Sequence, residues 1–193
     1  HFDDDQKLNL GGEEREVTVL FSDIRGFTAM SEKMKPKEVV STLNSYFSEM
    51  IDIIFKYDGT LDKIVGDELM VVFGAPISRE DDAARAVKTA IGMVESLKKF
   101  NKKRIDKGKV PVNAGIGINK GKVISGNIGS KDQMDYTVIG DTVNLGARLC
   151  SFAGPLKIII SKSVQGEIGG DFKTRKLEAI KVKGKRKPVE IFK

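Results

Sequence analysis

The chain has 193 residues, of which 40% are apolar and 31% are charged, which fits one folded domain with a core of its own. A single histidine, His1, and a single cysteine, Cys150, exclude histidine-based catalysis, a histidine metal site and a disulfide framework. No apolar run approaches the roughly 20 residues that span a membrane, and no signal peptide is recognised, so we expect a cytoplasmic domain that makes no membrane contact.

The formal net charge is +6, and much of the excess lies near the C-terminus, in Lys181, Lys183, Lys185, Arg186 and Lys187. A basic surface suits nucleic acid, acidic lipid or a polyanionic small substrate, and it is equally typical of a solvated face. The chain has no tryptophan and three tyrosines, which disfavours a stacking platform for single-stranded nucleic acid. We therefore expect no nucleic-acid partner.

Residues 1–14 are polar and contain glycine, so we expect a linker or the tail of a larger protein there, and a single domain over residues 15–193. Alternating apolar residues predict a strand over Glu16–Ser22, with a loop at Arg25–Phe27 after it. Apolar residues at helical spacing then predict a helix from about Pro36 to Tyr57.

The next segments read as two strands and a second helix. Strands are predicted over Thr60–Val65 and Glu68–Phe73, joined by a hairpin turn at Gly66–Asp67 where glycine supplies a positive φ. A helix with its apolar face over Ala83–Leu97 follows.

The second half of the chain begins with a predicted strand pair, Val112–Ile118 and Lys122–Ile128, around Gly121. A short strand at Tyr136–Ile139 precedes a helix that starts near Asp141. Later strand candidates are Ile158–Ile160, Lys176–Val182 and Val189–Phe192. The order β-α-β-β-α-β, followed by further elements, predicts an α+β fold with a ferredoxin-like core and C-terminal additions.

Two carboxylates converge in this topology. The first and second strands run in the same direction with the third antiparallel between them, so Asp23, just past the first strand, meets Asp67 in the hairpin. Such anions repel and one pKa rises, a conflict that hard divalent cations such as Mg²⁺ remove. Asp67 taken alone reads as an ordinary turn residue, but the convergence favours a metal site.

Three other side chains are candidates on spacing alone. Asn144 and Arg148 are four residues apart and share a helix face, which suits a phosphate or a ribose, or simply a surface arginine bonded to a neighbour. Lys63 on the second strand either pairs with a carboxylate such as Asp62 or donates to an acceptor on a base ring.

Gly115–Gly121 does not fit a phosphate-binding loop. Lys120 stands where the dinucleotide pattern needs its third glycine. Gly121 and Gly126 have the spacing of the Walker pattern, but Asn127 stands where that pattern needs lysine. We interpret these glycines as strand and turn devices.

Four ordered segments resemble the motifs of class III adenylyl and guanylyl cyclases. Val19–Thr28 resembles the first metal motif, Lys63–Asp67 the second, Tyr136–Arg148 the signature helix, and Val182–Lys185 the C-terminal lysine segment. The match covers nearly the whole chain from about Arg15, and the four motifs together are highly specific.

The resemblance implies a head-to-tail homodimer whose active sites, at the interface, convert ATP to 3′,5′-cyclic AMP and pyrophosphate in cyclic-nucleotide signalling. One subunit would hold two Mg²⁺ or Mn²⁺ ions with Asp23, Asp67 and the backbone carbonyl of Ile24. The partner would supply Lys63 and Thr137 to the base, Asn144 to the ribose, Arg148 to the transition-state phosphates, and Lys183 to the terminal phosphates, with Lys185 a competitor for that last role.

The resemblance also bears on the substrate. Lys63 is the adenine-type residue of the family, where guanylyl cyclases usually carry glutamate. The second base-reading residue is commonly aspartate in adenylyl cyclases, but here it is Thr137, as in the subclass that contains bicarbonate-responsive soluble adenylyl cyclases. That subclass suggests bicarbonate or calcium as regulators. Because a hydroxyl both donates and accepts, we expect ATP as the main substrate with some GTP turnover.

Two other functions remain open at this stage. Val65–Leu69 nearly matches the Gly-Gly-Asp-Glu-Phe hairpin of diguanylate cyclases, but those enzymes have no role for Asn144 and Arg148. A nucleotide- or effector-binding module that has lost turnover would lack a metal aspartate or the Asn/Arg pair, and all four residues are present.

Overall fold

The computed structural model describes residues 12–178 and the backbone of residues 189–191. The elements in chain order are β1 (Glu13–Arg25), α2 (Phe27–Glu32), α3 (Pro36–Lys56), β2 (Thr60–Val65), β3 (Glu68–Phe73), α4 (Asp82–Asp106), β4 (Asn113–Ser130), β5 (Gln133–Ile139), α5 (Asp141–Phe152), β6 (Ile158–Ile160), α6 (Lys162–Ile168), β7 (Thr174–Lys176) and β8 (Val189–Ile191). None of these helices is long and apolar enough to cross a membrane.

The strands form one mixed sheet in the order β2-β3-β1-β4-β6-β8-β7, with β5 paired to β4. β3 lies antiparallel between β1 and β2, and β1 is antiparallel to β4. The segment from β1 to β4 therefore has the predicted β-α-β-β-α-β order, with β6, β8 and β7 added beyond it. The expected α+β class and ferredoxin-like core are confirmed.

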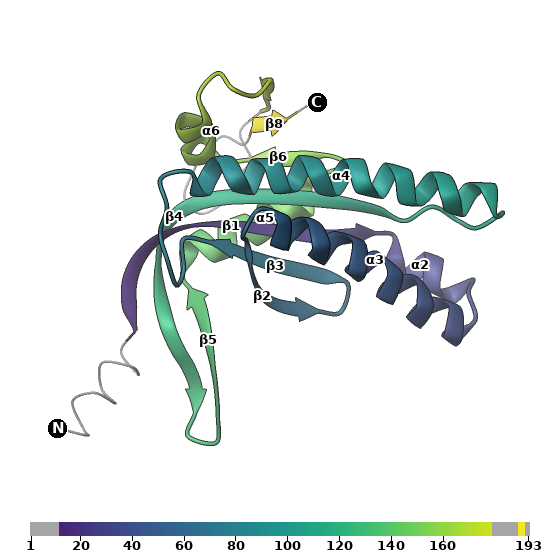
Figure 1. Ribbon diagram of the computed structural model, residues 1–193, viewed down its shortest axis with the longest axis horizontal. Coiled ribbons are helices and arrows are strands. Elements are labelled where there is room, and N and C mark those ends of the chain that lie inside the picture. The colour runs from purple at the N-terminus through teal and green to yellow at the C-terminus, as the bar shows by residue number, and fades with distance from the viewer. Residues whose placement is uncertain (1–11, 179–188, 192–193) are drawn as a thin grey trace.

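Alternation along β1 sends its side chains to two different cores. Leu20 and Ile24 pack with α3 and α4 on one face of the sheet, whereas Val19 and Phe21 pack with α5 on the other. The helices thus form two layers around a central sheet, and the β4–β5 hairpin projects away from the body as an arm (Figure 1). Because alternate side chains of β1 are buried on both faces of the sheet, the register of β1 with its neighbouring strands is strongly specified.

One sequence-based prediction is wrong in a way that shapes the molecule. The strand pair around Gly121 is a single continuous strand, β4, in which Gly121 lies opposite Val17 of β1. The turn comes later, at residues 131–132, and returns the chain as β5. Gly121 does not form a turn. It allows α5 to approach the strand, because a Cβ there would collide with Thr142 of α5.

The other predicted element boundaries differ less from those of the structure. β1 starts at Glu13 and runs through Arg25, so it is longer than predicted, and the expected loop after it contains the short helix α2. Gly26 precedes that helix with φ 68°, a left-handed conformation that glycine adopts at little cost. β6 is confirmed, and a strand is found at β8. β7 begins before the predicted Lys176–Val182 strand, and residues 179–182 lie outside the described part of the chain.

Helix α5 packs close to the sheet because each side of the contact carries a glycine, Gly117 on β4 and Gly146 on α5. A Cβ on Gly117 of β4 would collide with the backbone of Cys150 and lie 2.8 Å from the carbonyl oxygen of Gly146. A Cβ on Gly146 of α5 would lie 2.8 Å from Val19 Cγ2. The absent side chains therefore set the height of α5 above the sheet.

Replacing Gly117 with alanine should lower the free energy of unfolding by about 1–3 kcal/mol, because backbone atoms in a packed contact have little room to yield. Thermal unfolding of the purified chain measures the change. Gly166→Ala is the matched control, since a Cβ there meets nothing within 4 Å and α6 gains a better helix former. Equal stability of the two variants would contradict this account of the α5 contact.

Candidate active site

Asp23 and Asp67 come together as the topology predicts. The β1–β3 pairing ends at Ser22 and Leu69, so Asp23 and Ile24 follow directly after the last pair. The hairpin between β2 and β3 turns at Gly66, with φ 62°, and brings Asp67 to the same edge. Both aspartates are half-buried, and their side chains lie within hydrogen-bonding reach of each other.

The electrostatics of this pair are unfavourable without a counter-charge. Burial raises the pKa of the Asp23 carboxyl, and the charge of Asp67 and a hydrogen bond to it raise that pKa further. Arg25 and the backbone N–H of Ile24 act in the opposite direction, but they do not reverse the shift. The edge therefore concentrates negative charge where solvent screens it poorly.

Two neighbours of this pair were not foreseen. Burial raises the pKa of Glu68, and the charges of Asp23 and Asp67 raise it further, so a third acid lies near the pair. Arg25 places Nη1 3.7 Å from Asp23 Oδ2. The same guanidinium donates from Nε to the Ala153 carbonyl at 2.8 Å and from Nη2 to the Cys150 carbonyl, which ties Asp23 to the C-terminal end of α5.

A buried tyrosine lies beside the aspartate pair. Tyr46 of α3 is fully buried, and its hydroxyl lies 3.2 Å from Ser22 Oγ, next to Asp23. Burial raises the pKa of Tyr46 to about 12, so the phenol stays protonated and able to donate at neutral pH. A hydrogen bond between two neutral side chains therefore connects β1 to α3 next to Asp23.

The geometry fits a Mg²⁺-type ligand set. Carboxylate oxygens are hard donors, and Mg²⁺ commonly takes one or two protein carboxylates together with substrate phosphates and water. Within the described ranges, no group of three or more Asp, Glu, His or Cys side chains is arranged to hold a metal ion by itself. Asp23 and Asp67 would thus be completed by a backbone carbonyl such as that of Ile24 and by oxygens of the substrate.

A second cluster joins β2 to β5. Thr137 Oγ1 donates to Asp62 Oδ2 at 2.7 Å across 75 residues of sequence, and Lys63 Nζ lies 3.9 Å from the same oxygen. The two residues expected to read the base are therefore neighbours. The alternative interpretation of Lys63, an ion pair with Asp62, also holds, and the two are compatible because Lys63 remains half-exposed.

The third set of candidate site residues lies on helix α5. Its buried residues are Leu145, Gly146, Leu149 and Cys150. Asn144 and Arg148 lie on the exposed side, as the four-residue spacing predicts. The Arg148 guanidinium stacks 5.4 Å from the centre of the Phe152 ring. Lys183 and Lys185 lie outside the described residues.

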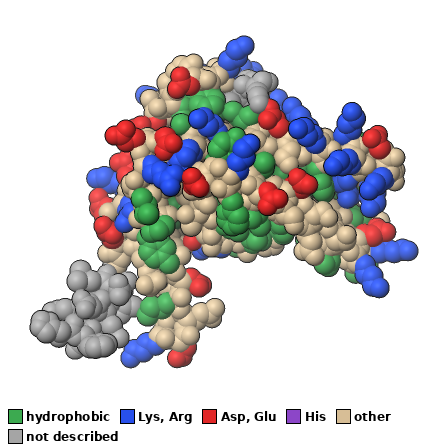
Figure 2. Space-filling model, viewed as in Figure 1, with side chains coloured by type: hydrophobic (Ala, Val, Ile, Leu, Met, Phe, Trp, Pro, Cys, Tyr) green, Lys and Arg blue, Asp and Glu red, His purple; other side chains and the backbone are tan. Residues whose placement is uncertain are grey.

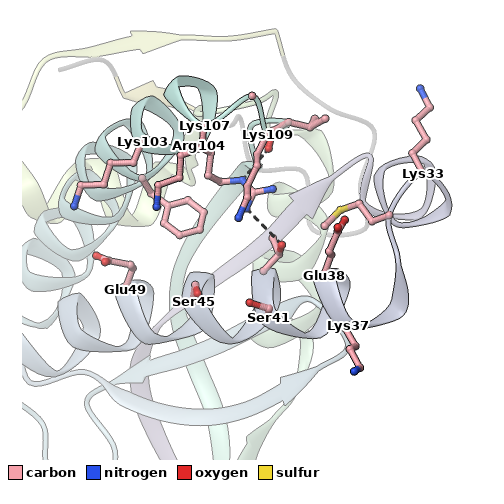
Figure 3. A pocket seen from close by; sticks show the side chains of 15 residues that line it. Lys33, Lys37, Glu38, Ser41, Ser45, Glu49, Lys103, Arg104, Lys107 and Lys109 are labelled. Carbon is pink, nitrogen blue, oxygen red and sulfur yellow. Dashed lines mark hydrogen bonds between the residues drawn. The ribbon is translucent and has the colours of Figure 1, made fainter.

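A cavity of about 690 Å³ lies elsewhere, between α3 and the C-terminal end of α4 (Figure 3). Its rim carries Lys37 from α3 with Lys103 and Arg104 from α4, and Lys and Arg side chains gather over the same end of the molecule in Figure 2. None of the candidate site residues lines it. The exposed candidate side chains, among them Lys63, Asn144 and Arg148, therefore lie on a different part of the surface.

Solved adenylyl and guanylyl cyclase domains have the same ferredoxin-like core with flanking helices. The family described as "Adenylate and Guanylate cyclase catalytic domain" matches residues 12–192, and the chain belongs to this family.

Three known proteins illustrate the relationship. The solved adenylyl cyclase CyaB from P. aeruginosa is 37% identical with a TM-score of 0.90, covering 94% of this chain and 95% of that one. The solved guanylyl cyclase Cya2 is 39% identical with a TM-score of 0.86, covering 93% of each chain. An adenylate cyclase of Anabaena cylindrica is 36% identical over 92% of this chain, which spans only 36% of that relative's length.

Replacing Asp23 with asparagine should stabilise the metal-free chain. Because the folded-state pKa of Asp23 is raised, its charge opposes folding fully above that pKa and not at all below the ordinary aspartate pKa. We expect the variant to unfold at a temperature about 2 °C or more higher at pH 7, and the difference to shrink as the pH falls toward 4. Thermal unfolding across this pH range measures it.

Magnesium gives the complementary result. The ion should raise the unfolding temperature of the parent chain and have little effect on Asp23→Asn, because a ligand stabilises only the form that binds it. A variant less stable than the parent at pH 7 without metal would contradict the repulsion inferred here.

Proposed function

We propose that this chain, as a homodimer, converts ATP to 3′,5′-cyclic AMP and pyrophosphate with two divalent metal ions at each active site. The observation that carries the proposal is the contact between the carboxyls of Asp23 and Asp67 at one sheet edge. Membership of the cyclase family supports the reaction class. The choice of ATP rests on Lys63, because relatives with both nucleotide specificities are equally similar.

The reaction is an intramolecular displacement. The ribose 3′-oxygen attacks the α-phosphorus as its proton leaves, the bond from that phosphorus to the bridging oxygen breaks, and pyrophosphate departs. Bound divalent ions would lower the pKa of the 3′-hydroxyl and neutralise the triphosphate. Because nucleophile and electrophile belong to one molecule, holding the substrate in line is a large part of the task.

The protein groups divide this task. Asp23 and Asp67, together with the Ile24 carbonyl, would hold the divalent ions, which would neutralise the triphosphate. Asn144 orients the ribose, and Arg148 stabilises negative charge as the phosphoryl group transfers. Lys63 and Thr137 bind the base, and Lys183 or Lys185 contacts the terminal phosphates.

The proposal of a homodimer is supported by the arm. Met134, Tyr136 and Ile139 of β5 are each more than 40% exposed, and Ile124 of β4 is 38% exposed. Exposed apolar side chains run along this arm in Figure 2. A projecting apolar hairpin suits contact with a second copy of the chain, and the candidate residues, open on one chain, would then close into a site.

Cyclic nucleotide production by the purified chain tests the function. With ATP and Mg²⁺ or Mn²⁺ we expect cyclic AMP, and Asp67→Ala should lower kcat by about a thousandfold or more because it removes a metal ligand. A higher kcat/KM for GTP would sink the assignment of ATP. A cyclic dinucleotide as product would instead indicate a diguanylate cyclase, and ATP binding without pyrophosphate release would indicate a binding module.

Mixing two inactive variants tests the shared site. Asp67→Ala and Arg148→Ala are each expected to be inactive alone. In a head-to-tail heterodimer one site carries both lesions and the other carries neither, so an equal mixture should regain about a quarter of the parent activity. Asp67→Ala mixed with Asp23→Ala is the matched control and should stay inactive. No recovery in the first mixture, with heterodimers demonstrated by co-purification through a different affinity tag on each variant, would place each active site within one chain.

A further inference from the structure

The β2–β3 pairing contains a bulge at Asp62. Leu61 pairs with Val71, and Lys63 pairs with the next residue back, Met70, which leaves Asp62 as an extra residue on β2. In a regular strand neighbouring side chains point to opposite faces, and a bulge re-aims them. Here Asp62 and Lys63 come to the same place, since Lys63 Nζ lies 3.9 Å from Asp62 Oδ2.

The Asp62 side chain is buried despite its charge, being only 6% exposed. A buried carboxylate is tolerated when it is hydrogen-bonded and paired. Thr137, itself only 8% exposed, provides the hydrogen bond from β5, and Lys63 provides the positive charge. The three residues form one cluster across two strands that are not neighbours in the sheet.

This cluster fixes the direction of the Thr137 hydroxyl. A hydroxyl has one hydrogen to donate and two lone pairs to accept with, whereas an ionised carboxylate only accepts. The Thr137 hydrogen is committed to Asp62 at 2.7 Å. What Thr137 can offer to a ligand is therefore an acceptor, and the ambiguity expected of a free hydroxyl is removed.

An acceptor distinguishes the two purines at position 6. Adenine carries an amino group there, which donates, and guanine carries a carbonyl oxygen, which accepts. Lys63 cannot make this distinction, since an ammonium donates equally to adenine N1 or to guanine O6. When guanine binds at a site that offers a buried acceptor, that acceptor faces guanine O6, which is also an acceptor. Neither group then has a hydrogen-bond donor, and this mismatch is costly.

We propose that Asp62 is a specificity-determining positioning residue, which selects ATP over GTP by holding the Thr137 hydroxyl as a hydrogen-bond acceptor. The inference rests on the proposed function, in which Lys63 and Thr137 bind the base. Asp62 acts through Thr137 and does not touch the nucleotide.

The test is the ratio of kcat/KM for ATP to kcat/KM for GTP, which is independent of the fraction of active protein. Asp62→Ala frees the hydroxyl to rotate and donate to guanine O6, so the ratio should fall about tenfold, the worth of one hydrogen bond. Asp62→Asn keeps the side-chain volume in case the alanine variant does not fold. Because its NH₂ can donate to Thr137, we expect a smaller fall in the same direction.

A double mutant separates this role from a structural one. Thr137→Val removes the acceptor, and adding Asp62→Ala to it should leave the ratio where Thr137→Val alone puts it. A merely structural Asp62 would lower turnover of both nucleotides together and leave the ratio unchanged in every background. That result, with a parent enzyme that prefers ATP, would overturn this inference alone. A parent that prefers GTP or forms no cyclic nucleotide would overturn the proposed function and this inference with it.

Discussion

The mutual repulsion of Asp23 and Asp67 is the constraint on which the site depends. Neither residue is unusual alone, since Asp23 simply follows the end of the β1–β3 pairing and Asp67 lies in a hairpin turn. The sheet forces them together because β3 lies antiparallel between β1 and β2, and the register leaves no freedom to separate them. The buried cores on both faces of β1 supply the stability that offsets this local cost.

Helix α5 is coupled to that acidic edge rather than merely packed near it. Its height is set by Gly117 and Gly146, and its C-terminal carbonyls are bonded by Arg25, which also pairs with Asp23. In the proposed dimer, Asp23 of a chain serves one active site while Asn144 and Arg148 of the same chain serve the other. Arg25 would then lie between the two sites, so a shift of α5 in one would be felt at the metal ligands of the other.

Sequence reasoning worked where a residue's place follows from strand order. The meeting of Asp23 with Asp67 needed only the β-α-β-β-α-β pattern, and the shared face of Asn144 and Arg148 needed only helical spacing. It failed at Gly121, because a glycine in a strand can mark a turn or a close helix contact and only the tertiary structure decides. The Thr137–Asp62 bond and the Arg25 bonds could not be predicted for the same reason, since they join residues distant in sequence.

The cavity and the candidate site lie in different parts of the molecule. The hollow of Figure 3 lies between α3 and α4, and residues of a single chain line it. In the proposed dimer each copy would contribute part of the active site, which fits the half-exposed Lys63 and the exposed Arg148 of a single chain. Chemistry is therefore better located here by where charges and hydrogen bonds converge than by where space is enclosed. Buried Asp62 shows this most clearly, because its carboxylate is satisfied by Thr137 and Lys63, and none of these three residues lines the cavity of Figure 3.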